Sequence, residues 1–207
     1  MNKKIKIALS CLSLLLVIIG MSACTTQDEL TLTNLLSTRP TQQSGDIVIT
    51  SSSMMDPFSF ETNVKNSDAA VIGKVVEILP SKIDNIKLFS TEIIYTVVII
   101  EVERWLYGQF ESKLIAIRVE EGRVDNKIMI GENEPVFILG EVCLLILENP
   151  SYHGDIPVGF NVTDYFVVFD GKWGKYIIES EKLIDWQGKQ QVISNFEQTI
   201  AEIRMVN

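Results

Sequence analysis

Several side chains in this sequence belong to the types that carry out acid–base chemistry. The single histidine, His153, lies two residues after Ser151 and two before Asp155. A histidine general base needs a nucleophile and an orienting acid, and neighbours along one loop do not define such a triad. We therefore predict no catalytic residue and no enzyme. A hydrolase that combines His153 with scattered carboxylates is the alternative.

Acidic residues gather in two predicted turns without the spacing of a metal site. One turn holds Glu120, Glu121 and Asp125, and the other holds Glu132 and Glu134. Calcium loops repeat oxygen ligands at alternate positions, and zinc sites need three or four Cys, His or carboxylate ligands. Neither pattern occurs in this sequence. We expect solvated charge at these turns, with no metal and no cofactor.

Aromatic residues give the clearest indication of binding. Trp173 and Tyr176 lie in a glycine-flanked turn, and Trp105 and Tyr107 end a predicted strand. Trp and Tyr are favoured contact residues at interfaces. We take these four residues as candidate ligand contacts that could share one surface patch, with core packing or capping of strand ends as the alternative.

The N-terminal segment has the composition of an export signal. Lys3, Lys4 and Lys6 precede an uncharged apolar stretch, residues 7–21, which is too short for a typical membrane-spanning helix. Small residues and Cys24 follow it. We predict a signal peptide over residues 1–23, with an uncleaved anchor or plain secretion as the other possibilities.

The sequence Met21-Ser22-Ala23-Cys24 resembles the lipobox of bacterial lipoproteins, with Met21 where leucine is usual. The resemblance implies that Cys24 carries fatty acyl chains, such as palmitate, and becomes the first mature residue. It further implies a protein of the cell envelope, held on the extracytoplasmic side of the cell membrane. An acylated Cys24 has no free thiol for catalysis, metal binding or a disulfide.

Charge and cysteine content narrow the classes of partner. Removal of residues 1–23 takes away three lysines and no acid, so the net charge falls from −9 to −12. Such a surface excludes nucleic acid, which needs basic contacts. Only Cys24 and Cys143 then remain, so there is no disulfide framework. Cys143 lies in an apolar run, and we expect it to be buried and inert.

Composition divides the mature chain into a tether and a globular domain. Residues 25–57 contain twelve Ser or Thr among 33 residues. We interpret residues 24–57 as the lipidated cysteine and a flexible tether, and residues 58–207 as a β-rich domain large enough for its own core.

The domain is predicted to be mainly β, because short runs rich in β-branched residues alternate with turns. Gly73 inside the first run indicates a bulge or a close backbone approach. Asp170-Gly171 is a favoured hairpin dipeptide. Ser194 and Glu197 fit a capping box before a C-terminal amphipathic helix. We expect strands at residues 69–79, 92–106, 114–120, 123–130, 142–147, 165–169 and 175–179, and a short helix at 59–66.

Residues 67–75, 95–108 and 140–147 together resemble an export-associated β-domain found in bacterial proteins of undefined activity. The pattern is also similar to netrin-like and tissue-inhibitor-of-metalloproteinase-like OB-folds. The resemblance covers about 80 residues and implies a small OB-like barrel or sandwich. The inhibitor's chemistry does not follow, because that family chelates zinc through a free N-terminal cysteine and Cys24 is expected to be acylated.

These observations favour a non-catalytic binding or interaction module on the outer face of the membrane. Its partners would be the membrane, through the lipid, and an envelope protein or polymer. A structural subunit of a larger envelope assembly is a third possibility, beside the surface hydrolase.

Overall fold

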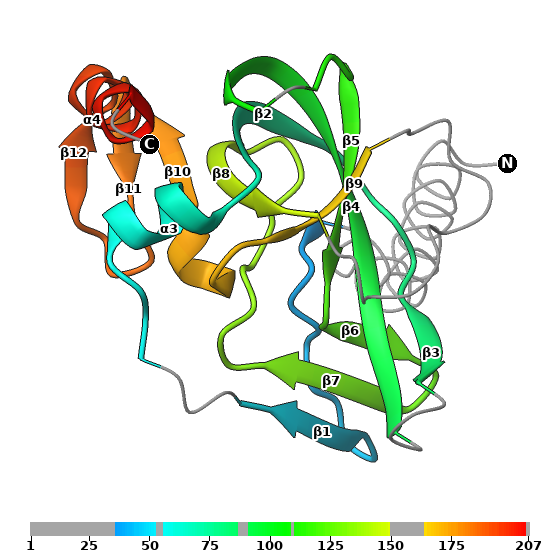
Figure 1. The fold of residues 1–207 in the computed structure, drawn as a ribbon. Coiled ribbons are helices and arrows are strands. Elements are labelled where there is room, and N and C mark those ends of the chain that lie inside the picture. Colours follow the sequence, from blue (N-terminus) through cyan, green and yellow to red (C-terminus); the bar gives the residue numbers. More distant parts are fainter. Residues whose placement is uncertain (1–35, 53–55, 87–90, 109, 150–163, 206–207) are drawn as a thin grey trace, which may run out of the picture. The chain divides into compact units, whose positions relative to one another are not determined.

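Five strands form a closed ring in the computed structural model, which describes residues 36–52, 56–86, 91–108, 110–149 and 164–205 (Figure 1). The order around the ring is β8-β2-β4-β5-β9, and β9 pairs back onto β8. The pairing of β5 with β9 is parallel, and the other ring pairings are antiparallel. The ring strands are β2 (Ala69–Ile78), β4 (Thr91–Tyr107), β5 (Leu114–Val119), β8 (Val142–Glu148) and β9 (Asp164–Val168). The closed ring and two helices confirm the prediction of a mainly β, OB-like barrel or sandwich.

Much of the ring is apolar on both faces, because its inner face packs in one core and its outer face packs in others, including a cluster of Tyr95, Val97, Ile99, Ala116 and Tyr165 on β4, β5 and β9. Val71, Ile117 and Phe166 belong to one buried cluster, the ring core. Leu144 and Ile146 point to a second cluster, the helix core, which the helices cover. Strands buried on both sides lose the alternation of apolar and polar residues. The near-continuous apolar runs in the sequence therefore predicted these strands correctly.

Two helices complete the helix core. Helix α3 (Phe60–Asn66) begins after Ser59, whose hydroxyl accepts a hydrogen bond from the Thr62 amide at 3.1 Å, as expected of an N-cap. Helix α4 (Ile193–Met205) buries Phe196, whose ring lies 4.2 Å from that of Phe60. Both predicted helices are therefore present. The predicted capping box is absent from α4. The helix begins one residue before Ser194, and Glu197 forms an ion pair with Arg104.

The sheet continues beyond the ring through three further strands, β10 (Lys175–Glu179), β11 (Lys182–Ile184) and β12 (Gln190–Val192). Strand β10 pairs with β8, and β11 and β12 follow as hairpins. The hairpin predicted at Asp170-Gly171 is wrong, because β9 and β10 both pair with β8 and not with each other. A short 3₁₀ helix, η1 (Gly171–Gly174), carries the chain along β8 from one to the other.

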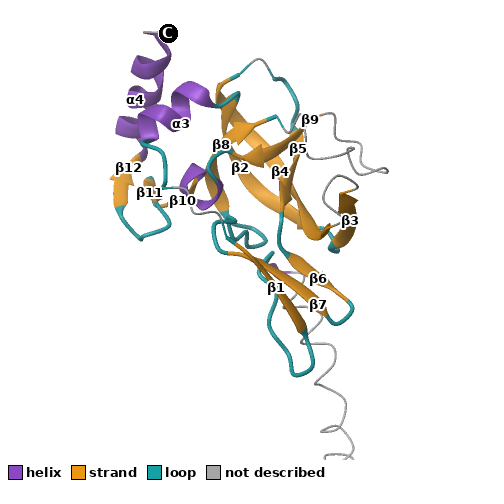
Figure 2. Ribbon diagram, turned by 60° about the horizontal axis from the view of Figure 1, so that its bottom comes forward, coloured by secondary structure: helices purple, strands orange, loops and turns teal. Residues whose placement is uncertain are grey.

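A separate three-stranded sheet has the order β1-β7-β6 (Figure 2). It consists of β1 (Ile47–Ser51), β6 (Gly122–Val124) and β7 (Lys127–Gly131). The single strand predicted at residues 123–130 is therefore a hairpin, turned at Asp125 with φ of 53°. Strand β3 (Lys82–Ile86), which the sequence did not predict, pairs with β4.

The tether prediction is wrong for residues 36–52, which are part of the folded unit. Strand β1 pairs in parallel with β7, and Ser37 bridges to Ile138. Thr38 is buried and exchanges backbone and side-chain hydrogen bonds with Phe137, each at 3.0 Å. Strand β1 lacks a buried residue, so its composition carries no core signal.

Gly73 confirms the predicted irregularity in the first ring strand. The β2–β4 register shifts between Ile72 and Gly73. A Cβ atom at Gly73 would lie 2.5 Å from Ile100 Cγ2 and 2.7 Å from the Glu101 carbonyl oxygen. The close approach of β4 therefore requires glycine at this position.

Candidate functional site

The four aromatic residues predicted as ligand contacts do not share one surface. Trp105 packs against Phe110 and Phe166 at the ring core. The Tyr107 hydroxyl lies 2.5 Å from that of Ser67 at the helix core.

Tyr176 is buried in the helix core, and its ring meets the Phe196 ring edge-on. Burial raises the pKa of its hydroxyl. Of the four residues, Trp173 has a different setting, because it lies on η1 beside a second tryptophan that the sequence pattern did not indicate.

That second tryptophan, Trp186, is half exposed at the tip of the β11–β12 hairpin. The two indoles meet edge-to-face with centroids 6.0 Å apart. Lys172 lies over both rings, with Nζ 5.0 Å from the Trp173 centroid and 4.7 Å from the Trp186 centroid. The same ammonium donates a hydrogen bond to the Glu132 carbonyl at 2.9 Å. Cation–π contacts and this hydrogen bond fix the position of the pair.

The turn that carries Trp186 is held by its own hydrogen bonds. The Asp185 carboxylate accepts from the Gln187 amide at 3.0 Å and from the Lys189 amide at 2.8 Å. Gly188 has φ of +81°, which closes the turn in a left-handed conformation. Asp185 to Gly188 is thus a recognisable turn sequence with an indole at its tip. This signal could have identified Trp186 from the sequence.

A cavity of about 270 Å³ opens beside Trp186, and we call it the indole cleft. A smaller hollow of about 250 Å³ adjoins the cleft, since Asp185 and Trp186 line both. The indole cleft combines an apolar wall with charged groups of both signs. Its lining residues are Arg39, Glu132, Glu134, Pro135, Val136, Lys172, Lys175, Ile177, Ile184, Asp185 and Trp186.

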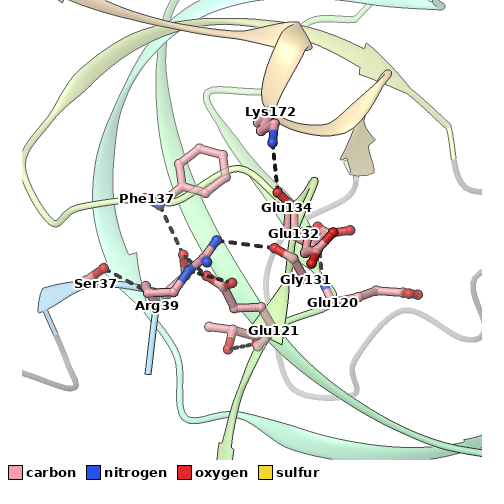
Figure 3. A network of polar contacts seen from close by, with 11 residues as sticks. Ser37, Arg39, Glu120, Glu121, Gly131, Glu132, Glu134, Phe137 and Lys172 are labelled. Atoms are coloured by element: carbon pink, nitrogen blue, oxygen red, sulfur yellow. Dashed lines mark hydrogen bonds and ion pairs between the residues drawn. The ribbon is translucent and has the colours of Figure 1, made fainter. Parts of the chain in front are cut away.

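Arg39 connects the indole cleft to a buried polar network (Figure 3). Its Nε lies 2.8 Å from the carboxylate of Glu121, and its guanidinium donates to the Gly131 carbonyl at 3.3 Å. The Thr38 hydroxyl donates to the same carboxylate at 3.3 Å. The segment that we predicted to be a tether therefore supplies one lining residue of the cleft, Arg39, which is also the counter-charge of Glu121.

Glu121 corrects the expectation of solvated charge at the first acidic turn, because its side chain is completely buried. Burial, with a smaller contribution from the negative charge of Glu134, raises the pKa of this carboxyl from 4.5 to about 7. Arg39 and Thr38 act in the opposite direction. Near neutral pH, Glu121 is thus divided between its charged and neutral forms.

The second acidic turn has a different role from the first. Glu132 and Glu134 both line the indole cleft. A Glu134 carboxylate oxygen also accepts a hydrogen bond from the Glu120 amide at 3.2 Å, which ties the two turns together. Among the described residues, no group of three or more His, Cys, Asp or Glu side chains is placed to hold a metal ion.

Cys143 is completely buried, as expected, and burial raises the pKa of its thiol to about 12. Such a thiol carries little thiolate and is unreactive. Cys24, His153, Ser151 and Asp155 lie outside the described residues. In the part of the chain that the structure describes, no helix has the length and apolar character needed to cross a membrane.

Comparison with known proteins adds no assignment: neither a protein family nor a curated protein matches this chain.

Proposed function

We propose that this chain is a lipid-anchored protein of the outer face of the cell membrane. Its folded unit binds an envelope polymer or protein in the indole cleft without catalysing a reaction. The observation that carries the binding proposal is Trp186, a half-exposed indole that lines a cavity and contacts Trp173 and Lys172. Preorganised aromatic anchors bind with little loss of side-chain entropy. The lipobox-like sequence ending in Cys24 supports the location.

The placement of the carboxyl groups favours binding over hydrolysis. Glu121, whose pKa lies near neutrality, would be the natural general acid of a hydrolase. Its side chain is completely buried and faces Arg39, which stands between it and the indole cleft. A general acid must reach the substrate, so Glu121 is badly placed for that role.

Fatty-acid labelling tests the anchor. Cells expressing the full chain and supplied with an alkyne fatty acid should incorporate the label at Cys24, because the lipobox cysteine is the acyl acceptor. Cys24→Ala should lose the label. Cys143→Ala, which removes the buried thiol, is the matched control and should remain labelled. Equal labelling of wild type and Cys24→Ala would contradict lipidation.

Site-specific photo-cross-linking in cells tests the binding site. A benzophenone amino acid at Gln187, next to Trp186, should form a covalent adduct with whatever occupies the cleft. The same group at Asn126 is the matched control, because Asn126 is also an exposed amide in a hairpin turn but lies between β6 and β7. Mass analysis of the adducts is the measurement. Identical adducts at both positions, or an adduct at neither, would contradict a binding site at the cleft.

A further inference from the structure

The chemistry of the indole cleft indicates what class of ligand it binds, provided that the cleft is the binding site proposed above. Trp186 lines both the indole cleft and the smaller hollow. A ligand unit resting on this indole therefore has a second hollow within reach, into which the next unit can continue. This arrangement suits a chain of repeating units better than a single compact molecule.

We propose that the indole cleft binds an uncharged saccharide segment of an envelope polysaccharide, with one pyranose ring stacked on Trp186. A pyranose ring presents a face of C–H groups that packs on an aromatic ring, and a rim of hydroxyls that need hydrogen-bond partners. The face of the Trp186 indole that Lys172 does not cover supplies the flat apolar surface. Glu132 and Glu134, which line the same cavity, supply carboxylate oxygens that accept from hydroxyl groups.

The charges of the cleft argue against an anionic ligand. Each of the three cations that line it already has an acceptor: Arg39 pairs with Glu121, Lys175 pairs with Glu141 at 2.6 Å, and Lys172 donates to the Glu132 carbonyl. A phosphate or carboxylate polymer would instead approach three acidic side chains, those of Glu132, Glu134 and Asp185. An uncharged polymer avoids this repulsion.

The apolar side chains of the indole cleft give the saccharide a second contact surface beside Trp186. Pro135, Val136, Ile177 and Ile184 line the cavity on its apolar side. The volume of about 270 Å³ lies just below the usual range for ligand pockets, so it accommodates a small unit of a longer ligand. The methyl group of an N-acetyl substituent would fit such a wall, which favours amino sugars over unsubstituted glucose.

Titration of the full chain in detergent with short β-linked oligomers of N-acetylglucosamine and of glucose tests the proposal. Saturable shifts of the Trp173 and Trp186 indole N–H signals are expected in nuclear magnetic resonance spectra, with the Trp105 signal unchanged. Trp186→Ala should weaken binding about tenfold or more, as expected for loss of an aromatic anchor. Trp186→Phe should retain part of the affinity, because a flat ring remains.

Two further variants separate the site from a general loss of folding. Ile47→Ala removes an apolar side chain of similar exposure from β1 and should bind as wild type does. Glu132→Gln keeps an acceptor oxygen and should weaken sugar binding by severalfold only. Thermal unfolding of each variant reports whether the fold is intact.

Three outcomes would overturn the saccharide proposal: no indole shift with either oligomer up to millimolar concentration, equal affinity of Trp186→Ala and wild type, or binding of oligolysine or polyglutamate but of neither sugar. A protein adduct at Gln187 together with absent sugar binding would leave the proposed binding function standing and reject only the saccharide. If neither an adduct at Gln187 nor sugar binding is observed, both the binding function and the saccharide proposal are rejected.

Discussion

Replacing Glu121 with glutamine should remove most of the pH dependence of stability between about pH 4.5 and 7. Burial raises the pKa of the Glu121 carboxyl from 4.5 to about 7 in the folded state, so the folded chain retains a proton that the unfolded chain releases. The free energy of unfolding must therefore fall as the pH rises through this window. A difference of this size corresponds to roughly 3 kcal/mol for one group.

Urea unfolding of wild type and Glu121→Gln at several pH values from 4.5 to about 8 measures the effect. The two curves should agree at the acidic end and diverge as the pH rises, with the variant the more stable near pH 8. Glu134→Gln is the control, since Glu134 only adds to the shift of Glu121 and its removal should reduce the pH slope slightly. Parallel curves for wild type and Glu121→Gln would show that Glu121 titrates normally.

Shortening the chain to the domain start expected from the sequence should cost at least about 3 kcal/mol of stability. A chain that begins at residue 58 lacks β1, Thr38 and Arg39, so the buried Glu121 loses its ion pair and Phe137 loses its backbone partner. The shortened chain leaves the buried Phe137 amide and carbonyl, and the buried Glu121 carboxylate, without the Thr38 groups that bond to them. Leaving a buried polar group without its partner costs about 1–3 kcal/mol for each group.

A chain that begins at residue 34 keeps all of these contacts and is the matched control. Its denaturant midpoint should equal that of the full chain, while the chain from residue 58 should unfold at much lower denaturant or fail to fold. Arg39→Met in the chain from residue 34 isolates the ion pair and should show a smaller loss. Equal stability of the two shortened chains would mean that residues 36–52 contribute little.

The sequence predicted the ring strands because burial on both faces requires long apolar runs, such as residues 142–147. It did not predict the partners of these strands. Asp170-Gly171 has the local sequence of a hairpin turn. In the structure, however, β9 and β10 pair one after the other with the same edge of β8. That edge exists only in the assembled sheet, so the local sequence could not predict this pairing. Strand β1 was not predicted, because its side chains are exposed or half-buried and its sequence therefore lacks the pattern of a buried strand.

The candidate site was only partly predictable for a related reason. Trp173 was selected from its glycine-flanked turn, but its neighbour Trp186 is thirteen positions further along the chain and reaches it through the β11–β12 hairpin. Glu121 was predicted to be a solvated turn residue, because the residues around it in the sequence do not indicate that Arg39 and Thr38 cover its side chain. Both the pairing of the two tryptophans and the burial of Glu121 depend on contacts between distant segments. The spacing of residues within one segment does not predict such contacts.

The participation of residues 36–52 in the fold also affects the order in which the protein can fold. These residues are the first of the folded unit to be synthesised, yet Ile47 pairs with Lys127, and Thr38 bonds to Glu121 across 83 positions. Contacts of such wide separation close late, because the intervening chain must first be made and brought together. During synthesis, strand β1 therefore stays unpaired until β7, its partner about eighty residues further along the chain, has been made.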